Sequence, residues 1–379
     1  MAKNGSTVSM TRIIIASDSF KGTMTSAQVA DSIEAGILSV CPHCQVVKLS
    51  VADGGEGTLA AVCAVRNFRN VTISVSDPLC RRISASYAVL DDGTAVIEMS
   101  QASGLTLLGE SERNPLDTST YGTGELIAHA LSCGCRKFLI GIGGSATNDA
   151  GMGMLSALGY KFLDVEGNLL PVSGGSLADI ARIDSSSAYP ALKDSEFIVA
   201  CDVESPLSGP QGAACVFGPQ KGADADMVRT LDEGLRHFAS VAGDDGQFPG
   251  AGAAGGLGYA FKVFLNAGLV RGIDLILDAV GFDDIISGAD LVITGEGRYD
   301  SQTSSGKVVH GITSRASARN VPVLVVAGTV DPSCVSPEII QAAPSDGHMA
   351  TAEDITYSVE CALRNIRKGI ICEDIVQNR

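Results

Sequence analysis

One pattern of apolar and polar positions recurs along the chain. A run of β-branched and other apolar residues is followed by a loop rich in Gly, Asp and Ser, and then by apolar positions at helical spacing. In the first copy, a strand over Ile13–Ala16 leads through a polar loop to a helix that Thr25 or Ser26 caps. The same order predicts further units over residues 45–65, 137–159 and 289–316, and a last buried strand over residues 321–330.

These apolar runs indicate parallel strands. Strands that are apolar on both faces and alternate with helices are typical of a parallel sheet covered by helices on both sides. In such sheets, ligands bind at the carboxyl ends of the strands. The unusual Gly- and Asp-rich loops all follow predicted strands. The fold class is therefore α/β, and the loops are expected to converge on one site.

The middle of the chain has a different pattern, which predicts a second domain. Residues 83–99 read as two strands joined by a turn at residues 91–93, which favours an antiparallel hairpin. Long Gly-rich and helical stretches follow it. We therefore predict a discontinuous α/β domain over residues 1–75 plus 285–379, with a mixed α/β domain over residues 76–284 inserted into it.

The composition excludes several classes of function. The chain has 379 residues, 45% of them hydrophobic, and a formal net charge of -16. Nucleic acid and anionic membrane both require a positive protein surface, so neither is expected as a partner. No apolar run approaches the roughly 20 residues that cross a bilayer, and residues 1–12 lack the apolar centre of a secretory signal. We expect a cytoplasmic protein that binds small molecules, and the sequence leaves a homo-oligomeric state open.

The positions of the cysteines and histidines do not indicate catalysis or metal binding. Most of the 11 cysteines lie inside apolar runs, where cysteine acts as a small hydrophobic residue. Cys41 and Cys44 have the spacing of a redox motif, but no second Cys/His pair accompanies them, and we interpret them as ordinary packing residues. The histidines lie outside the Gly-rich loops, which argues against a Ser-His-Asp hydrolase and against histidine-bound zinc.

The loops after the first two strands carry charged and hydroxyl side chains. Asp18, Ser19 and Lys21 lie on the turn into a helix, where N–H groups and a lysine charge suit a carboxylate or a phosphate. In the second loop, Asp53 and Glu56 surround paired glycines that let a ligand approach the backbone, and carboxylates can bind Mg²⁺. The alternative is that both are ordinary connections whose acidic residues cap the next helix.

The loop over residues 141–149 has the features of a phosphate site. It supplies consecutive N–H donors, the hydroxyls of Ser145 and Thr147, and the carboxylate of Asp149. It lacks the Gly-Lys-Ser/Thr end of a Walker loop and fits only the permissive GxGxxA form of the dinucleotide motif. A nicotinamide-binding interpretation is therefore weaker but stays open.

Later loops add further charges. Asp202 ends another predicted strand, and Lys221 lies in a Gly/Pro-rich loop beyond it. Residues 249–261 are Gly-rich enough for a hinge or a second phosphate loop. A last strand-end cluster can bind both an anion and a metal, through Glu296, Arg298, Asp300 and Lys307.

Carboxylates, glycines, hydroxyls and a few lysines together favour phosphoryl transfer. That reaction needs N–H groups and lysine for phosphates, acids for Mg²⁺, and one acid to accept a hydroxyl proton. Two other classes stay open. A nicotinamide- or flavin-dependent enzyme would explain the order of strands and helices but not the clustered acids. An inert two-domain binding protein would explain a cleft but not the pairs of lysine and acid.

In this order, the motifs resemble type I glycerate kinase (glycerate 2-kinase). The matching segments run from about Arg12 to past Val330 and include SDSFKG, ADGGEG, GIGGSATNDAGMG, ACDVESPLSGPQGAACVFGPQKGA and TGEGRYDSQTSSGK. Ser17 replaces the family's usual proline and Ala150 its glycine, and neither change removes a candidate charge. The resemblance implies a Rossmann/flavodoxin-like three-layer α/β domain with a second mixed α/β domain inserted in it, and an active site in the cleft between them.

The resemblance also implies an activity, which is transfer of the γ-phosphoryl of ATP, with Mg²⁺, to the 2-hydroxyl of D-glycerate to give 2-phosphoglycerate. Another short hydroxy acid is the alternative substrate. Under this hypothesis glycerate is bound by Asp18, Ser19, Lys21, Asp53, Gly54, Gly55, Glu56 and Arg298. ATP is bound by Gly143, Gly144, Ser145, Thr147, Asn148 and Lys221. The catalytic candidates are Lys21, Asp149 and Asp202, and the metal candidates are Asp149, Asp202, Glu296 and Asp300.

Overall fold

The computed structural model of the chain describes residues 11–20, 23–51, 62, 66–300, 308–343 and 349–367. The chain divides into two compact units, which we call the terminal unit (residues 1–53 and 276–379) and the middle unit (residues 54–275). The sequence places these boundaries later, after residues 75 and 284. Strand β3 (Phe68–Ser76) lies in the segment that the sequence assigns to the outer domain, but it pairs along its length with β4 (Arg82–Leu90) in the middle unit.

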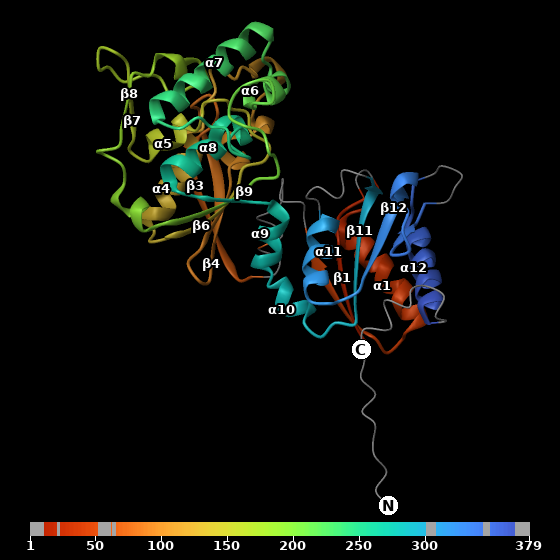
Figure 1. Ribbon diagram of the computed structural model, residues 1–379. Helices are drawn as coiled ribbons and strands as arrows, with labels where there is room; N and C mark the ends of the chain where they lie inside the picture. Colours follow the sequence, from red (N-terminus) through yellow and green to blue (C-terminus); the bar gives the residue numbers. More distant parts are fainter. Residues whose placement is uncertain are drawn as a thin grey trace, which may run out of the picture. The chain divides into compact units, whose positions relative to one another are not determined.

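The terminal unit is built on a sheet of five parallel strands in the order β13-β12-β11-β1-β2 (Figure 1). Its strands are β1 (Arg12–Ser17), β2 (Gln45–Ser50), β11 (Leu291–Tyr299), β12 (Val323–Val330) and β13 (Ile339–Gln341). β1 lies between β11 and β2 and is buried on both faces, since Ile13, Ile14 and Ile15 are all at most 3% exposed. The apolar run therefore predicts this central parallel strand correctly.

Helices cover both faces of that sheet (Figure 1). α1 (Ser26–Val40) and α12 (Ala352–Arg367) pack together on one face, where Ile13 and Ile15 meet Ile33 and Val359. α11 (Val308–Ala318) lies on the other face. α10 (Phe282–Ile286) precedes β11, and α9 (Gly272–Ala279) spans the boundary between the units.

Local sequence explains where α1 begins and ends. Thr25 caps it by accepting a hydrogen bond from the N–H of Gln28, and the Gln28 side chain accepts one from the N–H of Thr25. At the other end, Cys41 and Cys44 form a disulfide across the connection to β2. The prediction of a Thr25 cap is thus confirmed. The interpretation of these two cysteines as ordinary packing residues was wrong, because the turn that joins α1 to β2 brings the two sulfurs together.

The middle unit contains a mixed sheet of six strands in the order β10-β9-β6-β5-β4-β3. Besides β3 and β4 it comprises β5 (Ala95–Glu98), β6 (Lys137–Gly141), β9 (Glu196–Ala200) and β10 (Gly268–Val270). β4 and β5 pair antiparallel, which confirms the predicted hairpin, whereas β5, β6, β9 and β10 are parallel neighbours. A separate antiparallel pair is formed by β7 (Lys161–Leu163) and β8 (Arg182–Asp184).

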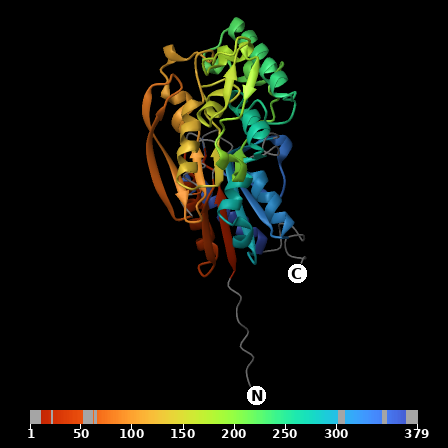
Figure 2. The ribbon, with the colours of Figure 1, turned by 90° about the vertical axis from the view of Figure 1, so that its left-hand side faces the viewer.

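Helices surround this second sheet. They are α3 (Ser100–Ser103), α4 (Tyr121–Ser132), α5 (Met152–Ala157), α6 (Ala213–Phe217), α7 (Ala225–Ala242) and α8 (Ala253–Leu265). α4 packs beside β3 and β4, as Figure 2 shows. Apolar residues of the sheet and the helices form one continuous core. Within the described part of the chain, no helix is long and apolar enough to span a bilayer.

Candidate active site

The carboxyl ends of β1, β11 and β12 surround a pocket of roughly 340 Å³ in the terminal unit. Asp18 and Ser19 reach it from the turn after β1, and Glu296 and Arg298 reach it from the last residues of β11. The pocket thus lies where a parallel sheet is expected to bind its ligand. Phe20 and Met349 add apolar surface to the lining.

The charged side chains of this pocket differ in their exposure and in their hydrogen bonds. The Asp18 carboxylate accepts a hydrogen bond of 2.6 Å from the N–H of Ser19, and the N–H of Asp18 donates to the carbonyl of Gly295. Glu296 is only 6% exposed. In contrast, the Arg298 side chain is 71% exposed, and its Nε lies 3.5 Å from the carboxylate of Asp300. An exposed guanidinium beside a hydroxyl and carboxylates suits a small acid that also carries hydroxyl groups.

Several predicted residues of the acceptor side lie outside the described residues. These are Lys21, Asp53, Gly54, Gly55, Glu56 and Lys307.

A second pocket, of roughly 400 Å³, lies in the middle unit at the carboxyl ends of β6 and β9. Gly143, Gly144 and Ser145 line it from the loop after β6, and Asp202 lines it from the segment after β9. Lys221 reaches the same pocket from a short 3₁₀ turn. The structure therefore brings together in one pocket five of the residues predicted from three separate stretches of sequence.

The loop after β6 leaves several of its N–H groups without a hydrogen-bond partner, and its other main-chain groups bond to the segment around Gly104. The carbonyl of Gly144 accepts from the N–H of Leu105, and the N–H of Ala146 donates to the carbonyl of Ser103. Among the described residues, the N–H groups of Gly143, Gly144 and Ser145 have no hydrogen-bond partner. Gly144 has a φ of 71°, which turns successive N–H groups toward one side. Such a concave run of unpaired N–H groups binds an anion.

Lys221 is a buried cation behind this loop. Its side chain is 2% exposed, and Nζ donates to the Ser145 hydroxyl and to the carbonyl of Thr147, both at 2.7 Å. Burial lowers the pKa of Lys221 to about 7, although the negative charge of Asp149 acts in the opposite direction.

Asp149 does not line the pocket, and its surroundings differ from those of a metal ligand or a base. It is fully buried, and its carboxylate accepts from the N–H and hydroxyl of Thr120 at 2.8 Å and from the N–H groups of Gly151 and Gly153. Thr120 precedes α4, whereas Gly151 and Gly153 lie at the start of α5. The carboxylate therefore joins the positive ends of two helices. Burial raises the pKa of Asp149, and these hydrogen bonds oppose the increase.

Thr147 and Asn148 also lie beneath the loop rather than on its surface. Both are completely buried, and neither lines the pocket. The hydroxyl of Thr147 and both amide atoms of Asn148 have no hydrogen-bond partner among the described residues. The prediction that Thr147 and Asn148 bind ATP directly therefore disagrees with their buried positions away from the pocket. A sequence of polar residues does not reveal which of them point inward.

Asp202, in contrast, is exposed and lines the pocket. One carboxylate oxygen accepts from the N–H of Gly272 at 2.8 Å, which fixes the side chain at the pocket wall. No group of three or more His, Cys, Asp or Glu side chains able to hold a metal exists in the part of the chain that the structure describes. The donor set therefore fits Mg²⁺ that arrives with phosphate oxygens, because that ion commonly uses only one or two protein carboxylates.

One buried acid near this pocket escaped the sequence-based prediction. Glu98 ends β5, is 6% exposed and lies beside Gly141 at the end of β6. A Cβ placed on Gly141 would lie 2.6 Å from a Glu98 carboxylate oxygen, so the acid packs directly against this glycine. The available signal was a carboxylate directly after the apolar run of residues 95–97.

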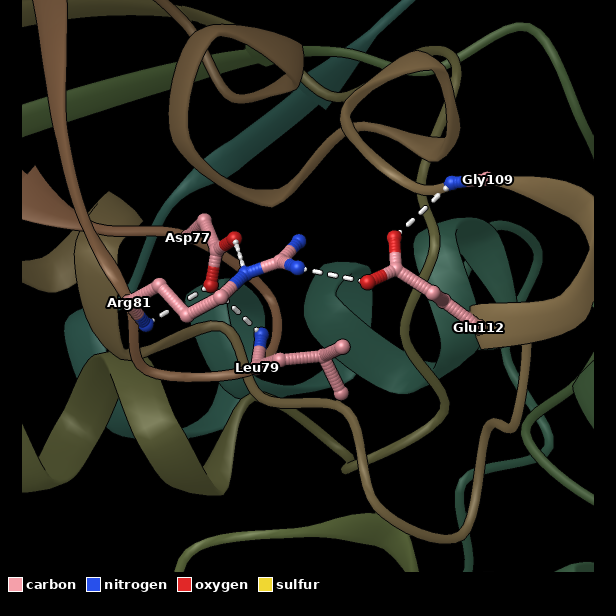
Figure 3. Close-up of polar contacts among 5 residues, drawn as sticks. All are labelled: Asp77, Leu79, Arg81, Gly109 and Glu112. Carbon is pink, nitrogen blue, oxygen red and sulfur yellow. Dashed lines mark hydrogen bonds and ion pairs between the residues drawn. The ribbon is translucent and has the colours of Figure 1, made fainter.

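Figure 3 shows a charge network around Asp77, in the turn after β3. Asp77 is 2% exposed and accepts from the N–H groups of Leu79 and Arg81, while Arg81 Nε donates to its second oxygen at 2.6 Å. Arg81 also donates to Glu112, whose other oxygen accepts from the N–H of Gly109. The turn so formed offers the carbonyl of Pro78 to the N–H of Ser119, next to Thr120. The network thus helps to position the residues behind the phosphate loop.

Fold and pockets together define an α/β protein with a loop of unpaired N–H groups at the end of a parallel strand. Comparison with known proteins gives the particular family. The model of the glycerate kinase family matches residues 13–370, and the chain belongs to this family.

Relatives agree with that assignment. The chain is 49% identical over 325 residues to the glycerate kinase of Bacillus subtilis strain 168, which covers 84% of this chain and 85% of the relative. It is 46% identical over 325 residues to the glycerate 2-kinase of Escherichia coli K12, with 84% and 85% of the two chains covered. A crystal structure from Salmonella typhimurium LT2 that carries a glycerate kinase 2 assignment superposes with a TM-score of 0.82 at 39% identity, covering 95% of this chain and 99% of that one. The predicted family and fold class are confirmed.

Proposed function

We propose that this protein transfers the γ-phosphoryl group of ATP to the 2-hydroxyl of D-glycerate, giving 2-phosphoglycerate and ADP. The observation that carries the proposal is the pocket of the middle unit, where three unpaired N–H groups and a buried lysine face one space. Membership of the glycerate kinase family supports the choice of substrate and an ATP-dependent transfer to an alcohol group. The 2-position is supported by the name of the Escherichia coli relative.

On the nucleotide side, we assign the phosphates of ATP to the N–H groups of Gly143, Gly144 and Ser145. Lys221 contributes a positive charge behind them. Mg²⁺ is treated as part of the MgATP substrate, and Asp202 is the carboxylate of this pocket that would bind it. Asp149, Thr147 and Asn148 shape the loop from within.

On the acceptor side, we assign glycerate to the pocket of the terminal unit. Arg298 would pair with the carboxylate of glycerate, and Ser19 would bind one of its hydroxyls. The carboxylates of Asp18 and Glu296 lie in the same pocket, where either can accept the proton of the reacting hydroxyl. Asp300 holds Arg298 in place. Lys21, Asp53, Gly54, Gly55 and Glu56, which lie outside the described residues, keep the roles that the family resemblance implies.

The proposal is tested by measuring ADP release with ATP and Mg²⁺ over a panel of short hydroxy acids. We expect D-glycerate to give the highest kcat/KM, with L-glycerate, lactate and glycolate far lower. ADP release that does not depend on any acid, or binding of NADH without turnover of ATP, would contradict it. A higher kcat/KM for another hydroxy acid would keep the kinase and change its substrate.

A further inference from the structure

Lys221 lacks the partner that a buried cation normally has. Its Nζ donates to two neutral acceptors, the Ser145 hydroxyl and the Thr147 carbonyl. In the part of the chain that the structure describes, Lys221 forms no ion pair with a carboxylate. A buried ammonium without an anion is unfavourable, so this side chain can lose its proton when nothing else neutralises it.

The surroundings of Lys221 show where the missing anion would lie. Ser145, which accepts from Nζ, lines the pocket together with Lys221 itself, and the unpaired N–H groups of Gly143 and Gly144 face the same space. Among described titratable groups, the buried Asp149 is the one whose charge acts on Lys221, and Asp202 lies on the pocket wall. A phosphate bound to the loop would add negative charge close to Nζ.

We propose that Lys221 takes up a proton when the phosphates of the nucleotide occupy this pocket, so that nucleotide affinity is linked to pH through this one side chain. The inference rests on the proposed function, since it assumes that the pocket binds nucleotide. The proton comes from solvent and bonds to the Nζ lone pair, and no other bond changes. In both states Nζ holds Ser145 and Thr147, so Lys221 is a positioning residue that also supplies the countercharge.

The direction of the effect follows from the two states of Lys221. Burial gives the free protein a Lys221 pKa of about 7, and a bound anion raises that pKa. Well below pH 7 the side chain is protonated with and without nucleotide, so binding takes up no proton. At pH 8 it is mostly neutral in the free protein and protonated in the complex, so binding takes up close to one proton and affinity falls as pH rises.

The test is isothermal titration of the whole protein with MgADP at pH 8, in two buffers of different ionisation enthalpy. The difference in heat gives the number of protons taken up, and phosphate ionisation of MgADP is complete at this pH. We expect close to one proton for the unaltered protein. Lys221→Met should take up none and bind MgADP about ten- to a hundredfold more weakly at pH 7, because a hydrogen-bonded charge is lost.

Two further variants separate proton linkage from a purely structural effect. Lys221→Arg keeps a charge that cannot titrate, so its MgADP affinity should not vary with pH between 6.5 and 8.5, and no proton should be taken up. Lys193→Met removes an exposed lysine of the same unit and should behave like the unaltered protein. If Lys221→Met does not fold, the arginine variant and the pH series still decide the question.

The outcomes are distinct. Binding of MgADP without proton uptake, or uptake that persists in Lys221→Met, would overturn the inference and leave the proposed function standing. A protein that releases no ADP with glycerate and binds no MgADP would overturn both.

Discussion

Asp149 has an environment that its sequence context does not reveal. It sits in a polar Gly-rich loop, where an acid is a natural metal ligand or base, yet its carboxylate is saturated by donors from the starts of α4 and α5. A carboxylate that accepts main-chain hydrogen bonds on both oxygens has little capacity for a metal or a reacting proton. Its carboxylate therefore holds the loop after β6 and the starts of the two helices together.

Replacing Asp149 by Asn should mainly destabilise the protein. The amide would turn its NH₂ group toward N–H donors and remove charge-assisted hydrogen bonds inside the core, at a cost of about 3 kcal/mol. Urea unfolding followed by circular dichroism measures this change. Asp194→Asn, which alters an exposed acid of the same unit, is the control and should be neutral. Unaltered stability with a large loss of kcat would show that Asp149 is catalytic instead.

Replacing Asp202 should lower activity and leave stability almost unchanged. It is exposed, lines the pocket and accepts a hydrogen bond from the N–H of Gly272. Asp202→Asn keeps the shape and should leave stability within about 0.5 kcal/mol. We expect kcat to fall about a hundredfold or more, since the variant loses a charge that acts on the transferring group. Steady-state kinetics at saturating MgATP measures this, and a kcat within a few-fold of normal would remove Asp202 from the chemistry.

At the level of elements, glycines let α4 and α5 approach their neighbours closely. Gly122 lies against β3, and a Cβ added there would be 1.9 Å from the carbonyl oxygen of Ser76. A Cβ on Gly153, at the start of α5, would be 2.2 Å from the Ser119 hydroxyl. These approaches bring the ends of both helices to Asp149.

Gly122→Ala should therefore push α4 away from β3. Backbone atoms cannot make room as a flexible side chain can, so we expect a loss of at least about 2 kcal/mol. Thermal unfolding provides the measurement. Gly268→Ala is the matched control, because a Cβ there meets nothing within 4 Å. Equal stability of the two variants would contradict the packing described for α4.

Sequence periodicity best predicts the elements that are determined by residues close to one another in the sequence. β1, the Thr25 cap and the β4–β5 hairpin all follow from residues close in sequence. The pairing of β3, the Cys41–Cys44 disulfide and the inward orientation of Thr147, Asn148 and Asp149 depend on contacts made only in the folded chain. Glycine-rich loops were located correctly, but the direction of their side chains could not be read from the sequence.

At the scale of the whole molecule, an acidic protein must still attract an anionic substrate. The formal net charge of -16 gives no long-range attraction for ATP or glycerate. Under the proposed function, binding would come from local groups, which are the loop N–H groups and Lys221 in the middle unit and Arg298 in the terminal unit. Mg²⁺ entering with ATP would add positive charge under the same proposal.

Removal of Mg²⁺ should abolish turnover, because under the proposed function the ion neutralises phosphate charge during the transfer. We expect EDTA to stop ADP release and added Mg²⁺ to restore it fully. Thermal unfolding should be unchanged by EDTA, because the ion is part of the substrate rather than of the fold. A fall in stability with EDTA would instead indicate a resident structural metal.

The position of phosphorylation tests the central proposal most directly. ATP, Mg²⁺ and D-glycerate are incubated with the protein and enolase alone, and formation of phosphoenolpyruvate is followed. Enolase accepts 2-phosphoglycerate, so transfer to the 2-hydroxyl predicts an immediate signal that equals ADP release. A signal that appears only after a phosphoglycerate mutase is added would mean transfer to the 3-hydroxyl and would contradict the proposal.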